Sequence, residues 1–509
     1  MLLFETILAL LLGAALLSMV AAKIGVPYPA LLALGGIGLA LAPGMPIPEM
    51  APELILTLFV APVLLDAAHD TSWRDLKRNW FPILSLVVIA VGLTTIAVAV
   101  AARYFLPDLP WAAAIALGAL LAPPDAVAAL AVMKAVSPPH RIRAVLEGES
   151  LLNDASSLLI YSLAVAAVVH GSFEASDILP AFFLVSVASV VVGYVLARLI
   201  GRATALIHDP ATATIIQLVT TFGIWMLADR LGLSSVITIV SFGITAGRRA
   251  SEGSPTEVRI KSFAAWEAVT MVLNVLAFTM IGLQLRPIAD SLSAEQWKVY
   301  PLYGLAILLI AISVRLVWVF VHGATRKLFV RGPDGLLGTW RGTFKSGLVV
   351  GWSGMRGIVT VAAALALPAD FPHREFILLV AFIVVLGTLI VQGLTLKPLL
   401  KLLKFPADTV VANEIRLGRE AAIRAGLATL EKEKSAAGLR LQQELAEALK
   451  TYDTSREFRY TSDSLLRRQM VPACRRAIDR LRDDSTIGDE AYRLLEQELD
   501  WFELGASVG

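Results

Sequence analysis

One acidic side chain, Asp154, stands inside a long apolar stretch, in the string GESLLNDASSLLIY. Ser150 lies four residues earlier, and four helical steps of about 100° return nearly to the same face. The hydroxyl and the carboxylate would then point into one cavity as two oxygen ligands for a small, hard cation. A carboxylate inside a membrane span is costly, so Asp154 is interpreted as the centre of a site for a transported ion. The alternative is a buried carboxylate that only holds helices together.

The neighbours of Asp154 have different predicted roles. Asn153 is an amide, so one group of the Asn153–Asp154 pair titrates, and it can hold either a proton or a monovalent cation. Glu149 lies about 140° round the helix from Asp154 and needs another partner. Arg315 stands in the middle of the apolar run AILLIAISVRLVWVF. A Glu149–Arg315 ion pair is therefore expected to hold the core together without touching the ion.

Two apolar segments contain residues that interrupt helices. Pro123 and Pro124 interrupt the first, because proline has no N–H and clashes with the preceding turn. Asp125 follows them and is expected to cap the second half-helix, with direct ligation of the cation as a secondary role. The second break lies in WSGMRGIVTVAAALALP. Arg356 there would face half-helix ends or a carboxylate, unless it snorkels to the membrane surface.

Other polar groups have more open roles. Asp66 could lie in a cytoplasmic funnel, reach the ion or be solvated at the membrane interface. The histidines fall in loops or at span ends without metal-ligand spacing, so we expect them to be solvated, and cytoplasmic ones could respond to pH. No nucleotide-binding loop, GxSxG or HExxH motif occurs. We therefore predict neither an enzyme nor a bound cofactor.

The composition indicates a membrane protein. The chain of 509 residues is 57% hydrophobic and 17% charged, whereas soluble domains carry about a quarter charged residues. Its net charge of +2 and single cysteine indicate neither a nucleic-acid partner nor a disulfide framework. Since a span needs roughly 20 mostly apolar residues, about thirteen spans are expected. They are placed at 3–22, 28–43, 53–68, 81–104, 111–134, 145–169, 178–200, 211–229, 232–248, 263–285, 300–322, 344–367 and 375–399.

The basic residues of alternate loops predict the orientation. Lys and Arg favour one set of loops by roughly four to one, which places that set and the C-terminus in the cytoplasm. The poorer set holds only Arg103, Arg230, Arg286, Lys298 and Arg374. An odd number of spans then places the N-terminus outside. The short loops suggest a bacterial inner membrane.

Two domains are expected, a transmembrane domain at 1–404 and a cytoplasmic helical tail at 405–509. The tail begins where the composition becomes charged and rich in Ala and Leu, and it either supports packing and dimer formation or regulates the membrane domain. If the first six and last six spans are related halves, both breaks fall in the fifth span of their half. Matching interruptions of this kind are typical of transporters built from inverted repeats.

These motifs resemble the NhaP/NHE-type sodium/proton exchangers of the monovalent cation:proton antiporter superfamily. The resemblance rests on PPDAVAAL, GESLLNDASSLLIY, APVLLDAAHD, SVRLVWVF and WSGMRGIVTVAAALALP, and it covers the chain to about residue 400. It implies an all-α polytopic membrane protein with the same number of spans, two inverted repeats and discontinuous helices that cross at mid-membrane. It also implies a homodimer, in which a mobile six-helix core moves against a dimerisation domain.

The resemblance assigns roles to the site residues. It implies that Asp154 binds the cation and the proton alternately, with further oxygens from Ser150 and the neighbourhood of Pro124. Asp66 matches an acidic position near the ion in some members. Many prokaryotic relatives carry threonine where Pro124 stands, so a side-chain oxygen is absent at that point.

Two further correspondences concern charge. Glu149 with Arg315 matches the buried ion pair of the family, in agreement with the pairing inferred from the residues alone. Asn153 matches the members regarded as electroneutral, which exchange one cation for one proton.

We therefore expect a secondary antiporter that exchanges Na⁺ or Li⁺ for H⁺ one for one by alternating access. A K⁺/H⁺ antiporter of the same fold is the closest alternative, because oxygen ligands alone do not fix ion size. A cation channel usually offers a ring of repeated charges around a symmetric pore, which one acid per chain does not supply. A membrane enzyme or a tail-coupled sensor has the least support.

Overall fold

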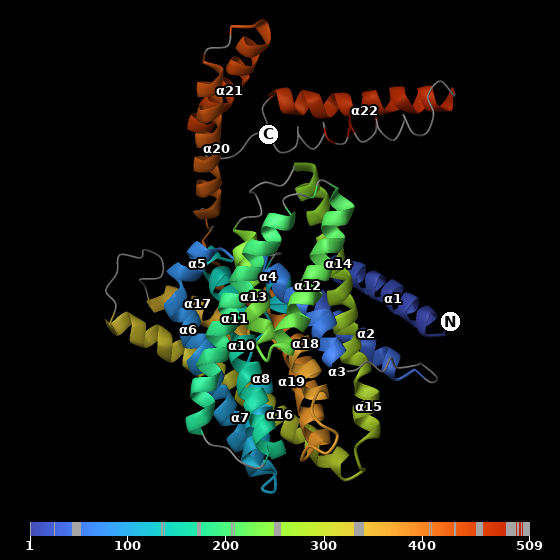
Figure 1. The fold of residues 1–509 in the computed structure, drawn as a ribbon, viewed down its shortest axis with the longest axis vertical. Coiled ribbons are helices and arrows are strands. Elements are labelled where there is room, and N and C mark those ends of the chain that lie inside the picture. Colours follow the sequence, from blue (N-terminus) through green and yellow to red (C-terminus); the bar gives the residue numbers. More distant parts are fainter. Residues whose placement is uncertain are drawn as a thin grey trace. The chain divides into compact units, whose positions relative to one another are not determined.

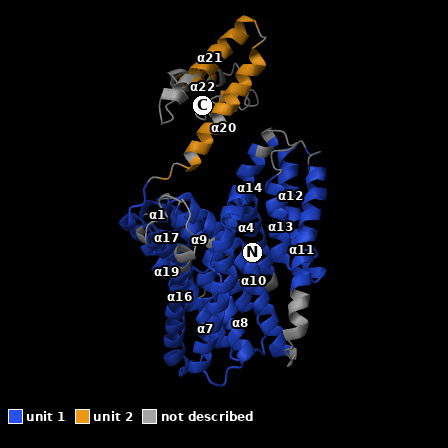
Figure 2. Cartoon of the chain, turned by 90° about the vertical axis from the view of Figure 1, so that its left-hand side faces the viewer, with its two compact units in different colours: residues 1–407 blue, residues 408–509 orange. Residues whose placement is uncertain are grey.

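The computed structural model consists of helices and connecting loops over the residues that it describes, and no strand occurs among them. Its chain divides into two compact units, Met1–Ala407 and Asp408–Gly509 (Figure 2). The boundary lies close to the one expected at residues 404 and 405. The described residues are 2–24, 26–42, 52–133, 136, 138–170, 175–204, 207, 209–248, 256–329, 340–406, 408, 410–431, 434–454, 462–484 and a few isolated positions after 494.

The first unit is a bundle in which α10 runs near the middle (Figure 1). Its first half comprises α1 Leu2–Ile24, α2 Tyr28–Ala40, α3 Pro52–Ile55, the π-helical η1 Leu56–Val60, α4 Ala61–Asp70, α5 Trp73–Arg78, α6 Trp80–Leu84, the π-helical η2 Ser85–Ala90, α7 Val91–Phe105, α8 Trp111–Leu121, α9 Ala126–Met133 and α10 His140–His170. Its second half comprises α11 Ala175–Thr204, α12 Pro210–Arg230, α13 Ser235–Gly247, α14 Thr256–Leu283, α15 Leu285–Asp290, α16 Gln296–Phe329, α17 Trp340–Trp352, α18 Ile358–Leu365 and α19 Arg374–Leu403.

The lengths of these helices agree with a protein that crosses a membrane several times. In the described part of the chain, seven helical stretches are long and apolar enough to span a bilayer. They are Trp80–Phe105, His140–Val169, Phe183–Thr204, Pro210–Arg230, Ile260–Asp290, Gln296–Ala324 and Arg374–Leu403. Within the described residues, each expected span overlaps a helix, a pair of half-helices or, at 53–68, the run of α3, η1 and α4. However, α2 and α13 have only 13 residues each. The total number of spans therefore stays a prediction.

Side-chain caps fix where several helices begin. Ser234 accepts a hydrogen bond from the backbone N–H of Ile237 at the start of α13, at 3.3 Å. Asp209 accepts one from the N–H of Thr212 at the start of α12, at 2.8 Å, and Pro210 occupies the first helical position. Hydrogen bonds from the Thr212 side chain and backbone hold the pKa of Asp209 below its usual value. These caps satisfy N–H groups that helix geometry leaves without partners.

Small residues allow the closest helix contacts. A Cβ added at Gly282 in α14 would collide with the backbone of α2 at Ala33, Gly36 and Ile37. A Cβ added at Gly193 in α11 would collide mainly with the backbone of α13. Because these contacts are made by backbone rather than by flexible side chains, larger residues at either position would force the helices apart.

The second unit contains three described helices, α20 Val410–Leu430, α21 Ala436–Thr454 and α22 Ser462–Asp483. The helices α20 and α21 pack against each other as a hairpin, and the side-chain amide of Gln442 donates to the carbonyl of Leu430 at 2.5 Å. Cys474, on α22, is a partly exposed free thiol. The described part of this unit is helical, and the role expected for residues 405–509 stays a prediction.

Candidate functional site

The long helix α10 carries several buried polar groups through an apolar environment. Glu149, Asn153 and Ser157 follow one another at intervals of four residues, so they lie on one face of the helix, and each is at most 1% exposed. Asp154 lies beside this face and is 8% exposed. Such a concentration of buried polar groups on one helix calls for partners, a bound ion or a proton.

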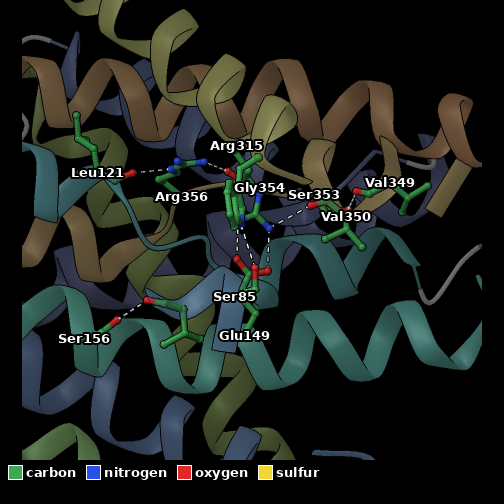
Figure 3. Close-up of polar contacts among 12 residues, drawn as sticks. Ser85, Leu121, Glu149, Ser156, Arg315, Val349, Val350, Ser353, Gly354 and Arg356 are labelled. Atoms are coloured by element: carbon green, nitrogen blue, oxygen red, sulfur yellow. Dashed lines mark hydrogen bonds and ion pairs between the residues drawn. The ribbon is translucent and has the colours of Figure 1, made fainter. Parts of the chain in front are cut away.

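The structure brings Glu149 and Arg315 together in a bidentate ion pair (Figure 3). The Nη1 atom of Arg315 donates to Oε1 of Glu149 at 2.5 Å, and Nη2 donates to Oε2 at 2.8 Å. The same Nη2 also donates to the carbonyl oxygen of Val350 at 3.1 Å. One arginine on α16 thus holds α10 and the end of α17 in place, with both charges out of contact with water.

Asp154 differs from Glu149 in having no such partner. Among the described residues, its carboxylate makes no hydrogen bond and no ion pair. The neighbouring amide of Asn153 is fully buried, and neither its oxygen nor its nitrogen has a hydrogen-bond partner in the described part of the structure. Asp125 lies close enough to Asp154 for their negative charges to interact. Unpaired oxygens at this point are the chemistry that a monovalent cation or a proton would satisfy.

The first break separates α8 from α9 at residues 122–125. Pro123 and Pro124 are buried there, and the carboxylate of Asp125 accepts a hydrogen bond from the N–H of Val127 at 2.8 Å. Asp125 therefore caps α9, as its position after the prolines suggests, and its negative charge faces the positive end of that half-helix. The backbone N–H of Asp125 donates to the carbonyl of Met355 at 2.6 Å. The first break is thus joined directly to the second.

The second break separates α17 from α18, and Arg356 lies within it. This guanidinium is fully buried, and its Nε donates to the carbonyl of Leu121 at the end of α8, at 2.9 Å (Figure 3). Its Nη1 donates to the carbonyl of Gly354, and its backbone N–H donates to Oγ1 of Thr388 at 3.0 Å. The sequence left open whether Arg356 faces half-helix ends or a carboxylate. In the structure its guanidinium donates to carbonyl groups at half-helix ends. A fixed positive charge there faces the negative end of α8.

Two glycines make this crossing possible. A Cβ at Gly357 would overlap the carboxylate of Asp125, so only glycine allows the start of α18 to approach that group. A Cβ at Gly354 would collide with the side chain of Arg315. The negative charge of Asp125 therefore lies against the starts of both α9 and α18. The positive charge of Arg356 lies against the end of α8.

The sequence analysis missed several residues that join α10 and α19 to the breaks. The hydroxyl of Ser157 donates to the carbonyl of Ala119 in α8 at 2.5 Å, and that of Tyr161 donates to the carbonyl of Ala363 in α18 at 2.7 Å. Thr388 and Gln392, one turn apart on α19, are also fully buried. Thr388 accepts the backbone N–H of Arg356, whereas the side-chain amide of Gln392 has no hydrogen-bond partner in the described part of the structure. The sequence does carry a signal for these residues, because polar side chains recur every four positions inside apolar runs.

Asp66 and Ser150 are the remaining residues expected at the ion site. Asp66 is partly buried on α4, and its Oδ1 accepts a hydrogen bond from the indole N–H of Trp266 at 2.9 Å. Ser150 is partly buried on α10, one turn before Asp154. Whether these oxygens share an ion with Asp154 stays a prediction. No group of three or more His, Cys, Asp or Glu side chains arranged for a metal ion occurs among the described residues.

The expectation of solvated histidines is wrong at two positions. The Nε2 atom of His140 lies 3.0 Å from Oδ2 of Asp75, and Nδ1 of His322 lies 3.0 Å from the hydroxyl of Ser85. Burial opposes the charged form of Asp75, but the hydrogen bonds from His140 and Ser72 outweigh it and lower the pKa of Asp75. The sequence does not indicate these pairs because each joins segments that are distant along the chain.

Comparison with known proteins places the chain beside ion exchangers. A family model described as the transmembrane part of sodium/hydrogen exchangers matches residues 7–402. The low-affinity Na⁺/H⁺ antiporter NhaS1 of Synechocystis is 31% identical over 80% of this chain and 76% of its own length. A sodium, potassium, lithium and rubidium/H⁺ antiporter of Bacillus pumilus is 29% identical over 75% of this chain, which spans 59% of that relative.

A solved structure shows the same fold. The sodium proton antiporter MjNhaP1 from Methanocaldococcus jannaschii superimposes with a TM-score of 0.60 over 80% of this chain and 100% of its own. The sequence identity is 19%. This likeness concerns the arrangement of the helices, with seven apolar candidate spans in the described part of the present chain.

Proposed function

Because the chain belongs to the sodium/hydrogen exchanger family, as a multi-pass membrane protein, we propose that it exchanges Na⁺ or Li⁺ for H⁺ one for one at Asp154. The observation that carries this proposal is the contrast on α10 between a buried acid with an ion-pair partner and a buried acid without one. A carboxylate in that position is satisfied by a cation or by a proton, and one carboxylate does not hold both.

The neighbouring groups complete the proposed ion site. Ser150 supplies a hydroxyl oxygen one turn before Asp154, and the unpartnered amide oxygen of Asn153 is a further ligand. The backbone around Pro124 supplies carbonyl oxygen in place of a side chain, and Asp66 supplies charge on the approach to the site. Oxygen ligands of this kind suit small, hard cations. Asp125 and Arg356 hold the broken helices around the site through their opposite charges.

The proposed exchange is electroneutral. Asn153 does not titrate, and Glu149 is held by Arg315. Only Asp154 then changes partner during a cycle, from a proton on one side of the membrane to a cation on the other. The same net charge is carried in both directions, so the membrane potential does not drive the cycle.

The rest of the architecture follows the family. We propose about thirteen spans arranged as two inverted repeats, with a six-helix core that moves against a dimerisation domain in a homodimer. The N-terminus lies outside, the C-terminus lies in the cytoplasm, and residues 405–509 support the dimer or regulate transport. A bacterial inner membrane is supported by relatives from Bacillus and Synechocystis.

A K⁺/H⁺ antiporter is the second candidate. It is favoured by the relative from Bacillus pumilus, whose name includes potassium and rubidium with sodium and lithium. Pro124 offers no side-chain oxygen, and one ligand fewer weakens discrimination in favour of a small ion. A channel is disfavoured, because the family consists of exchangers and the acid lies alone within an asymmetric bundle.

The test is an ion panel in proteoliposomes that hold a pH gradient and a pH-sensitive dye. Na⁺, Li⁺ and K⁺ are added in turn, with and without an imposed membrane potential. A response to Na⁺ or Li⁺ that is unchanged by the potential is the expected result. A response to K⁺ alone would establish the second candidate, and a flux driven by voltage without a proton gradient would establish a channel.

A further inference from the structure

A cavity of about 870 Å³ lies among α5, α10, α11 and α13 in the first unit. Its walls are mostly apolar and include Leu152 of α10, Val190 of α11 and Ile237 of α13. The helices α11 and α13 pack closely, with the hydroxyl of Ser241 donating to the carbonyl of Val190 at 2.8 Å. The helix α10 contacts α13, and the cavity lies between α10 and the α11–α13 pair.

Two arginines line the same cavity, each stacked on an aromatic ring. Arg198 lies in the last two turns of α11, with its Cζ 5.1 Å from the ring centre of Tyr194. Arg248 caps the end of α13, with its Cζ 5.9 Å from the ring centre of Trp73. All four of these side chains line the cavity. Among the described residues, neither arginine forms an ion pair with an acid.

The arginine side chains retain unused binding capacity. The Nε atom of Arg198 is buried and has no hydrogen-bond partner in the described part of the structure, although Nη2 donates to the hydroxyl of Tyr194 at 2.5 Å. Arg248 is exposed. A guanidinium matches the geometry of a phosphate, and its positive charge is uncompensated here.

These features select one chemical class of occupant. A cation would be repelled by both arginines, so the cavity is a poor route for Na⁺ to Asp154. A neutral apolar molecule would pack against the apolar walls but would leave both arginines without a counter-charge. An anionic head with an apolar chain satisfies both, and basic pockets between membrane helices are known binding places for such lipids. Arginine, Trp and Tyr are also the residues that anchor helices at the membrane surface.

We propose that this cavity binds one anionic phospholipid, with its phosphate between Arg198 and Arg248 and an acyl chain along the apolar walls. The chain would lie against Leu151, Leu152 and Ala155 on the face of α10 that turns away from Glu149 and Asn153. The lipid would link the helix that carries Asp154 to the α11–α13 pair. Its effect on transport rests on the proposed function, because movement between these helices is what exchange would require, whereas binding itself does not.

The experiment measures lipid retention by the purified protein. The full chain in detergent is titrated with phosphatidylglycerol or phosphatidylcholine of identical acyl chains, and bound lipid is counted by native mass spectrometry. The variant R198Q/R248Q removes the charges. The variant V190F adds bulk to the cavity lining without changing charge, at a side chain that is 49% exposed. R202Q is the matched control, since Arg202 is exposed on the same helix and does not line the cavity.

Wild type is expected to retain phosphatidylglycerol in preference to phosphatidylcholine. Each basic side chain contributes about 5-fold to binding of an anionic lipid surface, so R198Q/R248Q should lower the affinity about 30-fold. V190F should lower it as well, and R202Q should leave it unchanged. Equal retention of the two lipids, or an equal loss in R202Q, would overturn the proposal by showing ordinary contact with surrounding lipid. So would undiminished retention in V190F.

The same proteins in liposomes separate this proposal from the proposed function. Wild type should exchange ions several-fold faster with phosphatidylglycerol than without it, and R198Q/R248Q should lose that dependence. Absence of exchange in every lipid, with selective retention of phosphatidylglycerol intact, would reject the exchanger and leave the lipid site standing. Exchange that is normal and independent of phosphatidylglycerol would overturn the link between the lipid and transport.

Discussion

Two acids lie five residues apart on α10, and their surroundings differ completely. Glu149 meets the guanidinium of Arg315 through two hydrogen bonds at 2.5 and 2.8 Å. Asp154 is almost as deeply buried, but it makes no ion pair or hydrogen bond among the described residues and lies beside an amide that is equally unpartnered. The difference arises because α16 supplies a cation to one face of α10, whereas the broken helices supply a second acid, Asp125, near the other.

The contrast shows how one helix can hold a structural charge and a working charge. A buried pair with good geometry is costly to break, so Glu149 is held by Arg315. An unpaired buried carboxylate is unfavourable unless it takes up a proton or a cation. Under the proposed function, pairing keeps Glu149 out of the transport step, and the lack of a partner leaves Asp154 available for it.

The largest expected effect is loss of exchange in D154N. The amide keeps the size of the side chain but cannot exchange a proton for a cation, so transport should fall to background while the folded yield is maintained. Proteoliposome flux measures the activity, and size-exclusion elution with a melting curve measures the fold. The matched control is D229N, the same change at an exposed acid on α12. Exchange that persists in D154N would remove Asp154 from the mechanism.

Breaking the structural pair should affect folding rather than chemistry. In R315A the carboxylate of Glu149 is left buried and unpaired, which typically costs about 3–5 kcal/mol. The expected result is a strongly reduced folded yield and a lower Tm. The double variant E149Q/R315M removes both charges and should recover a large part of the loss. If R315A folded normally and lost only transport, the assignment of a purely structural role would be wrong.

A smaller change can be directed at the crossing alone. G357A places a methyl group against the carboxylate of Asp125 and should cost about 1–3 kcal/mol through overpacking. Exchange should weaken with it, because Asp125 lies close to Asp154. G92A is the control, since a Cβ at Gly92 meets nothing within 4 Å and should be neutral or slightly stabilising. Equal melting temperatures for both variants would contradict the close approach described at the crossing.

The smallest effect concerns Asp75, an acid outside the candidate site that is paired with His140. Hydrogen bonds from His140 and Ser72 lower the pKa of Asp75 against the opposing effect of burial. A lowered carboxyl pKa stabilises the fold above the unfolded value of about 3.9, and this stabilisation is lost as the pH falls through the lower folded value. D75N should therefore be less stable than wild type by about 1 kcal/mol at pH 7. The difference in Tm between D75N and wild type should therefore shrink as the pH falls below the unfolded pKa of Asp75. A difference that persists in acid would show that the carboxylate charge is not its cause.

Much of the fold could be predicted because it follows from local patterns. Apolar runs locate the helices, Pro123 and Pro124 locate the first break, and a lone acid and a lone arginine in separate spans suggest the Glu149–Arg315 pair. The partners of Arg356 remained open, because an arginine in an apolar segment can face a carboxylate, a helix end or the membrane surface. Only the three-dimensional crossing identifies the carbonyl of Leu121 as one of them.

The remaining contacts depend on which distant segments meet. Ser157 and Tyr161 bind carbonyl oxygens on other helices, and a carbonyl carries no sequence signal. The expected solvation of His140 and His322 failed for the same reason. The unpartnered state of Asn153 could not be predicted either, since an amide in a span more often finds a hydrogen bond.

The hydroxyl bonds of Ser157 and Tyr161 have a consequence for the direction of transport. They connect α10 to α8 and α18, so the helix that carries Asp154 and the two broken helices form one connected block. If that block moves as a unit, the ion meets the same ligands in the same geometry whether it enters from one side or the other. The intrinsic affinity would then be equal at the two membrane faces. Such an exchanger would half-saturate at the same ion concentration on either side of the membrane.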